Sequence, residues 1–524
     1  MLARLLTSAA ALTVMTGMAM ADYTITILHT NDFHDRFEPI SKYDSGCSAE
    51  DNDAGECFGG MARMVTAIEA AKARHENYLL VDAGDQFQGT LFFQYYVGDI
   101  SAEMMNGLGY DAMAVGNHEF NKGPEGLAAF VQAANFPVLM SNADLSGEAA
   151  LKGLIEKSVV IEKAGEPIGI IGVTPQNNDE LSSPGPNITF SDPSAAIQAE
   201  VDRLTEEGVN KIIVLSHSGF GVDNAIAVNT TGVDLIVGGH SNTFLSNTDE
   251  DAQGPYPEMT NGVPIVQAYA YGKYLGELTL TFDDDGNLLE ATGEPVLIDA
   301  SVAEDDGTKA RIAELAAPLE EIRSEVVSEA AAAIEGDRSF CRAVECAMGN
   351  LVADAMLDRV KDQGVQVAFQ NGGGLRASID AGEITKGEVL TVLPFQNTLS
   401  TFEVSGATLV EALENGVSQI EDGAGRFPQV AGLKFTFDAS KPVGERISEV
   451  MVAEGDGFAP IDADKTYGVV SNDYVRNGGD GYEMFVGAEN AYDFGPDLAD
   501  VTAEYLAANA PYEPYTDGRI TKAE

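Results

Sequence analysis

The segment Ile27-Leu-His-Thr-Asn-Asp-Phe-His34 decides the fold, because an apolar run passes directly into a loop of metal-ligating side chains. The apolar half has the length and composition of a buried strand. The same template recurs in the segments Val81–Asp85, Val115–Phe120, Leu215–Ser218 and Gly238–Asn242. In an α/β sheet, the carboxyl ends of the strands gather along one crevice. We therefore expect the loops of all these segments to converge on one site.

These loops predict a site for two divalent metal ions. Four of the six histidines in the chain lie in them, namely His34, His118, His217 and His240. Metals such as zinc or manganese accept imidazole nitrogen together with carboxylate and amide oxygen. A carboxylate can bridge two ions about 3.5–4 Å apart, and Asp85, next to a glycine, is the expected bridge. We expect zinc first, with manganese, cobalt or magnesium as alternatives.

The order of apolar runs predicts two α/β domains. The chain has 524 residues, which is too long for one hydrophobic core. Up to about residue 300, apolar runs alternate with amphipathic stretches, a pattern typical of layered α/β domains. The expected strands are Tyr23–Leu28, Tyr78–Val81, Ala112–Val115, Ile168–Val173, Ile212–Leu215 and Leu235–Val237, and the expected helices are Met61–Arg74 and Ala195–Glu207. From about Phe340 onward, strands, helices and glycine-rich turns indicate a second α/β domain.

A helical linker is expected between the two domains. Apolar residues recur there at spacings of three and four, as on one face of a helix: Ile312, Leu315, Leu319, Ile322 and Val326. Pro318 should kink this helix or restart it. We therefore expect a metal-binding domain at residues 22–303, a linker helix at 304–336 and a second domain at 337–524.

The first 21 residues predict a secretory signal. Arg4 precedes a short apolar run, and Ala19-Met-Ala21 forms a small-x-small cleavage site. The run is shorter than the ~20 residues needed to span a bilayer. The C-terminal residues lack the hydrophobic tail of a lipid-anchor signal. We expect a periplasmic or secreted protein without a membrane anchor.

Charge and cysteine content narrow the function further. The 83 acidic and 30 basic residues give a formal net charge of −53, which opposes binding to nucleic acid. Any site for an anion must therefore be locally positive. The four cysteines form two close pairs, Cys47/Cys57 and Cys341/Cys346. Three connectivities are possible, and local disulfides are favoured over metal ligation or free thiols because neither pair has zinc-ribbon spacing.

The second domain holds residues suited to a nucleoside. Its candidate segments are Asn371-Gly-Gly-Gly-Leu-Arg376, Leu393-Pro-Phe395 and Asn472–Tyr482. Aromatic faces can stack on a base at roughly 1–3 kcal/mol per face, a carboxylate can accept ribose hydroxyls, and arginines can bind phosphate. Taken singly, a glycine run can be a plain turn and an aromatic residue can belong to the core. The prediction therefore rests on their occurrence together.

The motifs of the first domain resemble those of the calcineurin-like metallophosphoesterases and, more narrowly, those of the 5′-nucleotidase family. They are Asp32-x-His34, Gly84-Asp85, Gly116-Asn-His-Glu119, His217 and Gly239-His-Ser241. The resemblance implies an N-terminal four-layer αββα sandwich and a C-terminal α/β domain that binds substrate. The implied ligands are Asp32, His34 and Asp85 for the first metal, and Asp85, Asn117, His217 and His240 for the second, with Asn242 near the first.

The resemblance also assigns His118 to stabilising the transition state beside the metals. Members of the family usually carry an aspartate three positions later, where this chain has Asn121. An amide can accept the imidazole N–H but adds no negative charge, so Asn121 should raise the pKa of His118 less than aspartate does. We expect activity to fall away at a lower pH than it would with an aspartate partner.

The cysteine loop Cys341-Arg-Ala-Val-Glu-Cys346 is similar to that of the AMP-hydrolysing ecto-5′-nucleotidase branch. The resemblance covers nearly the whole chain after the signal and implies a set of substrate-binding residues. They are Arg342, Asn371 and Arg376 near phosphate and ribose, Phe395 and Tyr474 stacking the base, and Asp480 on the ribose.

The implied function is that of an exported enzyme that hydrolyses nucleoside 5′-monophosphates, AMP foremost, with a metal-activated water. One alternative keeps the enzyme class and widens the substrate to nucleoside di- or triphosphates, UDP-sugars or 2′,3′-cyclic nucleotides. A remoter alternative is a periplasmic nucleotide-binding protein without catalysis, which has no need of two activating ions. The expected partner is a small nucleotide in each case, and the oligomeric state is left open.

Overall fold

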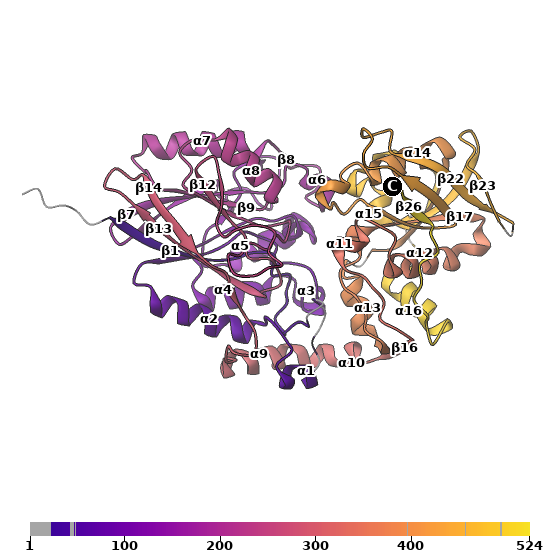
Figure 1. Ribbon diagram of the computed structural model, residues 1–524, viewed down its shortest axis with the longest axis horizontal. Helices are drawn as coiled ribbons and strands as arrows, with labels where there is room; N and C mark the ends of the chain where they lie inside the picture. Colours follow the sequence, from indigo (N-terminus) through magenta and orange to yellow (C-terminus); the bar gives the residue numbers. More distant parts are fainter. Residues whose placement is uncertain are drawn as a thin grey trace, which may run out of the picture.

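The N-terminal lobe is built on two β-sheets that pack face to face (Figure 1). The computed structural model describes residues 22–41, 44, 47, 49–395, 397–455, 457–492 and 495–523, so the expected signal segment lies outside the described residues. The first sheet has the order β14 (Leu288–Gly293), β13 (Tyr274–Phe282), β1 (Tyr23–Thr30), β2 (Tyr78–Asp82), β3 (Ala112–Ala114) and β4 (Val138–Leu139), and β15 (Val296–Leu297) also pairs with β13. The second has the order β11 (Glu258–Thr260), β12 (Val263–Val266), β10 (Leu235–Gly238), β9 (Ile212–Ser216), β7 (Glu166–Val173) and β6 (Ser158–Lys163).

Helices cover the outer faces of both sheets and complete four layers. Between the sheets, apolar side chains such as Ile27 and Val81 of the first and Ile170 and Leu215 of the second are fully buried. Burial of one such side chain contributes roughly 1.5–3 kcal/mol. The first sheet is covered by α2 (Met61–Arg74), α4 (Asp99–Leu108) and α5 (Gly123–Ala133), and the second by α7 (Pro193–Glu206) and α8 (Phe220–Asn229). The expected αββα sandwich is confirmed.

Parallel pairing brings the predicted loops to the same edge of the lobe. β1, β2 and β3 are parallel neighbours in the first sheet, and β7, β9 and β10 are parallel neighbours in the second. The expected strands and helices are confirmed, with ends that differ by one or two residues. The strand β13 was not anticipated, although its residues alternate between buried and partly exposed positions as it pairs antiparallel to β1.

The linker is shorter than predicted. α9 (Asp306–Ala316) is followed by a 3₁₀ turn (Ala317–Leu319) that contains Pro318, and by the one-turn helix α10 (Glu320–Arg323). The restart at proline is therefore confirmed, but the helical face through Val326 is wrong. Val326 and its β-branched neighbour Val327 begin the strand β16 (Val326–Ala330), which pairs with β18 (Gly382–Thr385). Figure 1 shows α9 and α10 running beneath both lobes.

The C-terminal lobe is a second α/β unit, as expected. Its main sheet has the order β20 (Pro428–Ala431), β17 (Val365–Asn371), β24 (Thr466–Asn472), β19 (Leu399–Ser405) and β25 (Glu489–Tyr492), and its smaller sheet has the order β23 (Gly457–Pro460), β22 (Ile447–Glu454), β21 (Leu433–Phe437) and β26 (Ile520–Lys522). The main sheet buries one face against α12 (Ala347–Val360), α13 (Lys386–Val392) and α16 (Leu498–Ala508), and the other against α14 (Gly406–Gly416) and the smaller sheet.

Both pairs of cysteines form local disulfides, Cys47–Cys57 and Cys341–Cys346, which confirms the prediction. The second disulfide links the last residue of the short helix α11 (Arg338–Cys341) to Cys346, the residue before α12. Within the part of the chain that the structure describes, no helix combines the length and the apolar composition needed to cross a membrane.

Candidate active site

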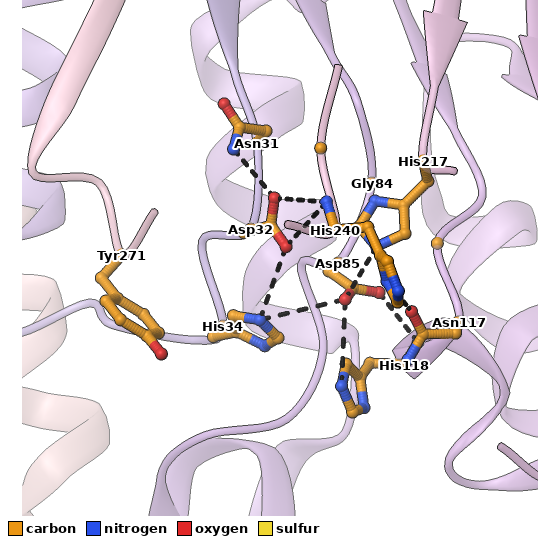
Figure 2. Close-up of polar contacts among 12 residues, drawn as sticks. Asn31, Asp32, His34, Gly84, Asp85, Asn117, His118, His217, His240 and Tyr271 are labelled. Atoms are coloured by element: carbon orange, nitrogen blue, oxygen red, sulfur yellow. Dashed lines mark hydrogen bonds and ion pairs between the residues drawn. The ribbon is translucent and has the colours of Figure 1, made fainter. Parts of the chain in front are cut away.

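The loops after β1, β2, β3, β9 and β10 meet at one point, as Figure 2 shows. Asp85 lies at its centre. Its Oδ2 atom is 2.9 Å from Nε2 of His217 and 3.9 Å from Nε2 of both His34 and His118. His240 completes the group through its Nδ1 atom, which lies 2.8 Å from Oδ1 of Asn117. The structure thus brings all four of these histidines together.

The arrangement fits a pair of divalent ions. Two groups of ligand atoms, each within 4.8 Å of one another, share Asp85: one with His34 and His118, the other with His217 and His240. Nε2 of His34 is buried without a hydrogen-bond partner among the described residues, and it lies 3.9 Å from carboxylate oxygens of both Asp32 and Asp85. A cation bound at about 2.0–2.2 Å from each atom would satisfy all three. The mixed nitrogen and oxygen donors of these groups suit such a metal pair.

Backbone conformation helps to place these ligands. Asp32, His34, Asp85 and His240 all have positive φ angles, between 49° and 71°, which non-glycine residues rarely adopt. Such conformations cluster at functional sites, where the surrounding structure holds them. Gly84 has φ of 97°, and a Cβ there would lie 2.7 Å from the Gly116 backbone nitrogen. Only glycine fits this position without moving the neighbouring loop.

The backbone also orients two of the imidazoles. His34 donates its Nδ1 hydrogen to the carbonyl of Phe87 at 3.0 Å, and His217 donates its Nδ1 hydrogen to the carbonyl of Ala83 at 2.7 Å. Each ring therefore turns its Nε2 atom toward the centre of the site. Such hydrogen bonds fix the tautomer and ring orientation of metal-binding histidines.

The charges of the metal-free site are uneven. Burial alone would lower the pKa of His217, but the Asp85 carboxylate beside it, together with Asp32, raises the pKa to about 10. The same pair holds the pKa of Asp85 well below its usual range against the effect of burial. Burial lowers the pKa of His34 and lowers that of His240 to about 3. At neutral pH, His34 and His240 are therefore uncharged and Asp85 is ionised, as metal ligation requires, whereas His217 is protonated.

Glu119 ties two of the ligand loops together, a role that the sequence motif did not reveal. Its carboxylate accepts hydrogen bonds from the backbone of the loop after β2, at Asp85 (3.0 Å), Gln86 (2.8 Å) and Phe87 (3.2 Å). It also accepts one from Gly116 in the loop after β3, at 2.7 Å. Glu119 is fully buried, so these four donors stand in for the water that burial removes.

His118 contacts Asn121 as the sequence suggested. Its Nδ1 atom donates to Oδ1 of Asn121 at 2.7 Å, and the amide nitrogen of Asn121 donates to the hydroxyl of Ser182 at 3.3 Å. Burial lowers the pKa of His118 to about 4, while the hydrogen bond to Asn121 acts in the opposite direction. The ring of Phe395, from the other lobe, lies 5.8 Å from the imidazole.

A single cleft joins this group to the C-terminal lobe. It has a volume of about 2050 Å³ and is lined by the predicted metal ligands Asp32, His34, Asp85, Asn117 and His240, by His118 and Asn121, and by the predicted substrate residues Arg342, Asn371, Arg376, Phe395, Tyr474 and Asp480. His217 lies behind it, fully buried. All the predicted metal-binding and substrate-binding residues except His217 therefore line this cleft.

Within the C-terminal part of the cleft, the polar residues contact one another. Asp480 accepts hydrogen bonds from Asn371 at 2.6 Å and from the hydroxyl of Tyr474 at 3.3 Å. The guanidinium of Arg376 lies 5.8 Å from the centre of the Phe395 ring. Arg342 donates to the carbonyl of Gly423 at 3.3 Å. The side of the cleft formed by the C-terminal lobe therefore offers aromatic, acidic and basic groups.

Arg338, which was not predicted from the sequence, also reaches the cleft. It begins α11, and its Nη1 atom donates to the hydroxyl of Tyr271 in the other lobe at 3.1 Å. With the amide nitrogen of Asn242 facing Asp32 at 3.1 Å, the Asn242 oxygen also accepts from Arg338. The one signal in the sequence was its position four residues before Arg342. Arg338, Arg342 and Arg376 thus bring three guanidinium groups to the cleft of a protein of net charge −53.

Known families and structures are similar to this chain over nearly its whole length. The calcineurin-like phosphoesterase profile matches residues 25–244, and the profile of the 5′-nucleotidase C-terminal domain matches residues 325–487. Snake venom 5′-nucleotidase of Naja atra is 39% identical over 525 residues, which cover 95% of this chain and 98% of the relative. The 5′-nucleotidase of Homo sapiens is 38% identical over 528 residues, covering 96% and 91%. The crystal structure of a 5′-nucleotidase precursor from Thermus thermophilus superposes with a TM-score of 0.91 at 42% identity, covering 95% and 99%.

Proposed function

This chain belongs to the 5′-nucleotidase family and is a phosphoric monoester hydrolase, and we propose that it hydrolyses nucleoside 5′-monophosphates, AMP foremost, to nucleoside and phosphate. One observation carries this proposal. The predicted metal ligands from one lobe and the predicted base-, ribose- and phosphate-binding residues from the other line the same cleft. A phosphate ester of a nucleoside would contact both sets of residues at once, with its phosphate at the metal ligands and its nucleoside at the C-terminal lobe.

The proposed metal ligands are those expected from the sequence. Asp32, His34 and Asp85 would hold the first ion, and Asp85, Asn117, His217 and His240 would hold the second, with zinc as the proposed metal. Their convergence around Asp85 and the mixed nitrogen and oxygen donors support this assignment. When bound, two such ions would lower the pKa of a water and stabilise negative charge at phosphorus.

The protein groups around the metals have separate proposed roles. His118 stabilises charge that develops on the phosphoryl group, and Asn121 fixes its ring by accepting the Nδ1 hydrogen. Because Asn121 accepts at Nδ1, the Nε2 atom of His118 is the one left to face the substrate. The amide of Asn121 is itself oriented by the hydroxyl of Ser182.

The C-terminal wall is proposed to select the nucleoside. Phe395 and Tyr474 provide faces on which a base can stack, and Asp480 accepts hydrogen bonds from the ribose hydroxyls. Arg342 and Arg376, with Asn371, bind the phosphate and ribose. Burial lowers the pKa of Arg376 only to about 10, so this guanidinium stays charged at neutral pH.

The domain limits are part of the proposal: residues 22–303, 304–336 and 337–524. Contacts support a division within the linker. Ile312, Leu315 and Leu319 pack into the core of the first lobe, whereas β16 pairs with β18 of the second. The segment around Ser324 is therefore where the chain passes from one lobe to the other.

We also propose that the protein is exported to the periplasm or secreted. Two disulfides support this location, because thiols stay reduced in the cytosol. The signal-like first 21 residues agree with it. One relative is a venom enzyme, which acts outside the cell that makes it.

Phosphate release from a panel of nucleotides tests the activity. We expect the highest kcat/KM on AMP, loss of activity after chelation, and recovery on refilling with zinc. Relative kcat/KM on AMP, ADP and UDP-glucose separates this proposal from a broader nucleotide hydrolase. Equal kcat/KM on all three would support the broader specificity instead. Undiminished phosphate release by Asp85→Ala would overturn the enzyme assignment.

A further inference from the structure

Tyr271 occupies an unusual position beside the first predicted metal ligands. It lies in the turn between β12 and β13, its φ angle is 60°, and its side chain is 3% exposed. A bulky residue with positive φ is a genuine outlier, and such outliers cluster at functional sites. The Tyr271 backbone donates to the carbonyl of Asp32 at 2.8 Å, and its ring centre lies 5.7 Å from that of His34.

The Tyr271 hydroxyl contacts a cation that comes from the other lobe. It accepts the hydrogen bond from Nη1 of Arg338 at 3.1 Å, and the same nitrogen donates to the side-chain oxygen of Asn242. A second guanidinium, that of Arg36, lies over the Tyr271 ring, 5.1 Å from its centre. Two acceptors of the first lobe, the Tyr271 hydroxyl and the Asn242 side-chain oxygen, therefore hold Nη1 of Arg338 in place.

The remaining edge of Arg338 has no such partner. Among the described residues, neither Nε nor Nη2 of Arg338 makes a hydrogen bond, and the side chain lines the cleft. Nε and Nη2 point from one side of the planar group, which is the geometry that binds two oxygens of a phosphate at once. Nη1 is anchored beside Asn242, whose amide nitrogen faces Asp32, so Nε and Nη2 are the donors that remain for a ligand.

We propose that Tyr271 is a positioning residue of the reaction: it holds Arg338 so that the guanidinium binds the substrate phosphate on the Asp32–His34 side of the cleft. This inference rests on the proposed function. It assigns to Tyr271 an effect on phosphate that acts through Arg338 and none on the nucleoside, which lies on the opposite wall with Phe395 and Tyr474.

Isothermal titration of the metal-loaded full chain with inorganic phosphate, and separately with adenosine, tests the assignment. Tyr271→Phe removes the acceptor but keeps the ring, and we expect it to weaken phosphate binding about tenfold or more, as the loss of one hydrogen bond to a charged group implies. Arg338→Met should weaken phosphate binding at least as much. Adenosine affinity and metal content should match wild type in both variants.

Two further variants separate positioning from a general structural effect. Tyr269→Phe is the matched control, because Tyr269 also has positive φ but its hydroxyl donates to Asp44 instead of meeting Arg338. It should leave phosphate affinity unchanged. In the Arg338→Met background, Tyr271→Phe should have no further effect, since the group that it positions is gone. Compared with the wild type, Tyr271→Phe should raise KM for AMP more than it lowers kcat.

Several results would overturn the proposal. Tyr271→Phe could bind phosphate like wild type, or its effect could add fully to that of Arg338→Met. Loss of metal or a lower melting temperature in Tyr271→Phe, but not in Tyr269→Phe, would make Tyr271 a structural residue. Failure of the proposed function looks different: the wild-type protein itself would then release no phosphate from any nucleoside monophosphate.

Discussion

At the scale of single residues, the proton on each imidazole decides what the site can do. His118 has an uncharged partner in Asn121, and burial lowers its pKa to about 4. His217 lies against Asp85 and has a pKa of about 10 in the metal-free protein. A charged partner should therefore raise the pKa of His118, whereas metal binding should remove the proton of His217. Both effects can be measured.

Replacing the partner of His118 should change the pH dependence of activity. Asn121→Asp adds a negative charge next to the ring and raises the pKa of His118. If charged His118 stabilises the transition state, the alkaline limb of the kcat profile should move to higher pH. The pH–rate profiles of wild type and Asn121→Asp measure this directly. An alkaline limb that stays in place would show that another group controls it.

Metal binding should release a proton from His217. In the unfolded chain this histidine loses its proton near 6.5, and in the metal-free fold it does so near 10. The His217–Asp85 pair therefore stabilises the metal-free fold fully below about pH 6.5 and loses that contribution as the pH rises through about 10. Ligation needs the neutral ring, so loading at pH 8 should release about one proton.

Calorimetric titration with zinc in buffers of different ionisation enthalpy counts these protons. His34 and His240 have lowered pKa values and should release none. The His217→Gln variant provides the control, because its proton release should disappear. An equal release in wild type and His217→Gln would contradict the assigned charge state.

At the scale of secondary structure elements, a few backbone contacts hold the ligand loops in place. Glu119 joins the loop after β2 to the loop after β3 through four backbone N–H groups. The strands bring the loops to one edge, but this carboxylate sets their spacing.

Glu119→Gln should break that connection. The amide NH₂ group replaces one acceptor oxygen, so two buried backbone donors lose their partner. We expect the free energy of unfolding to fall by about 3 kcal/mol, together with weaker metal binding. Denaturant unfolding of the metal-free protein measures the change, and Glu125→Gln, at an exposed position of α5, is the matched control. Equal stability in both variants would show that Glu119 does not join the loops.

The strand-end template predicted the elements well because it depends on local chemistry. Buried parallel strands are continuous apolar runs, and their loops carry the ligands, so β1, β2, β3, β9 and β10 could be placed from sequence. The linker could not, because its apolar spacing continues through Val326, while the partner strand β18 lies more than fifty residues away. Long-range pairing overrode a local pattern.

The same limit applies to the site. The candidate metal ligands could be predicted because Asp85 and four histidines share one placement, in loops directly after apolar strands. Glu119, Tyr271 and Arg338 act through contacts between segments that are distant in the chain or through backbone geometry. Glu119 belongs to a recognised motif and Arg338 lies four residues before Arg342, but neither position reveals these contacts, and nothing near Tyr271 distinguishes it from a core residue.

At the scale of the whole molecule, a strongly acidic protein has to attract an anion. The formal net charge is −53, yet the arginines at residues 338, 342 and 376 line the cleft. Distant charges are screened over a Debye length of about 8 Å at physiological ionic strength, while contacts inside the cleft are screened much less. We therefore expect the net charge to repel an anionic substrate at long range and the three arginines to bind it at short range.

Salt should consequently raise the efficiency of the enzyme at first. As ionic strength increases from about 10 mM to 150 mM, screening weakens the global repulsion and kcat/KM on AMP should rise. Steady-state kinetics in a series of sodium chloride concentrations measures the trend. A kcat/KM that falls from the lowest salt onward would show that the arginines dominate the field at long range as well.

The central claim is that one cleft applies metal chemistry from the first lobe to a nucleoside held by the second. The most direct test is the ratio of kcat/KM for AMP to that for ribose 5-phosphate, in wild type and in a Phe395→Ala/Tyr474→Ala double variant. Both substrates offer the same phosphate ester, and only AMP offers a base to stack. The account predicts a ratio of about 100 or more in wild type, from stacking on two faces, and a ratio near one in the double variant. Equal rates on both substrates in wild type would contradict it.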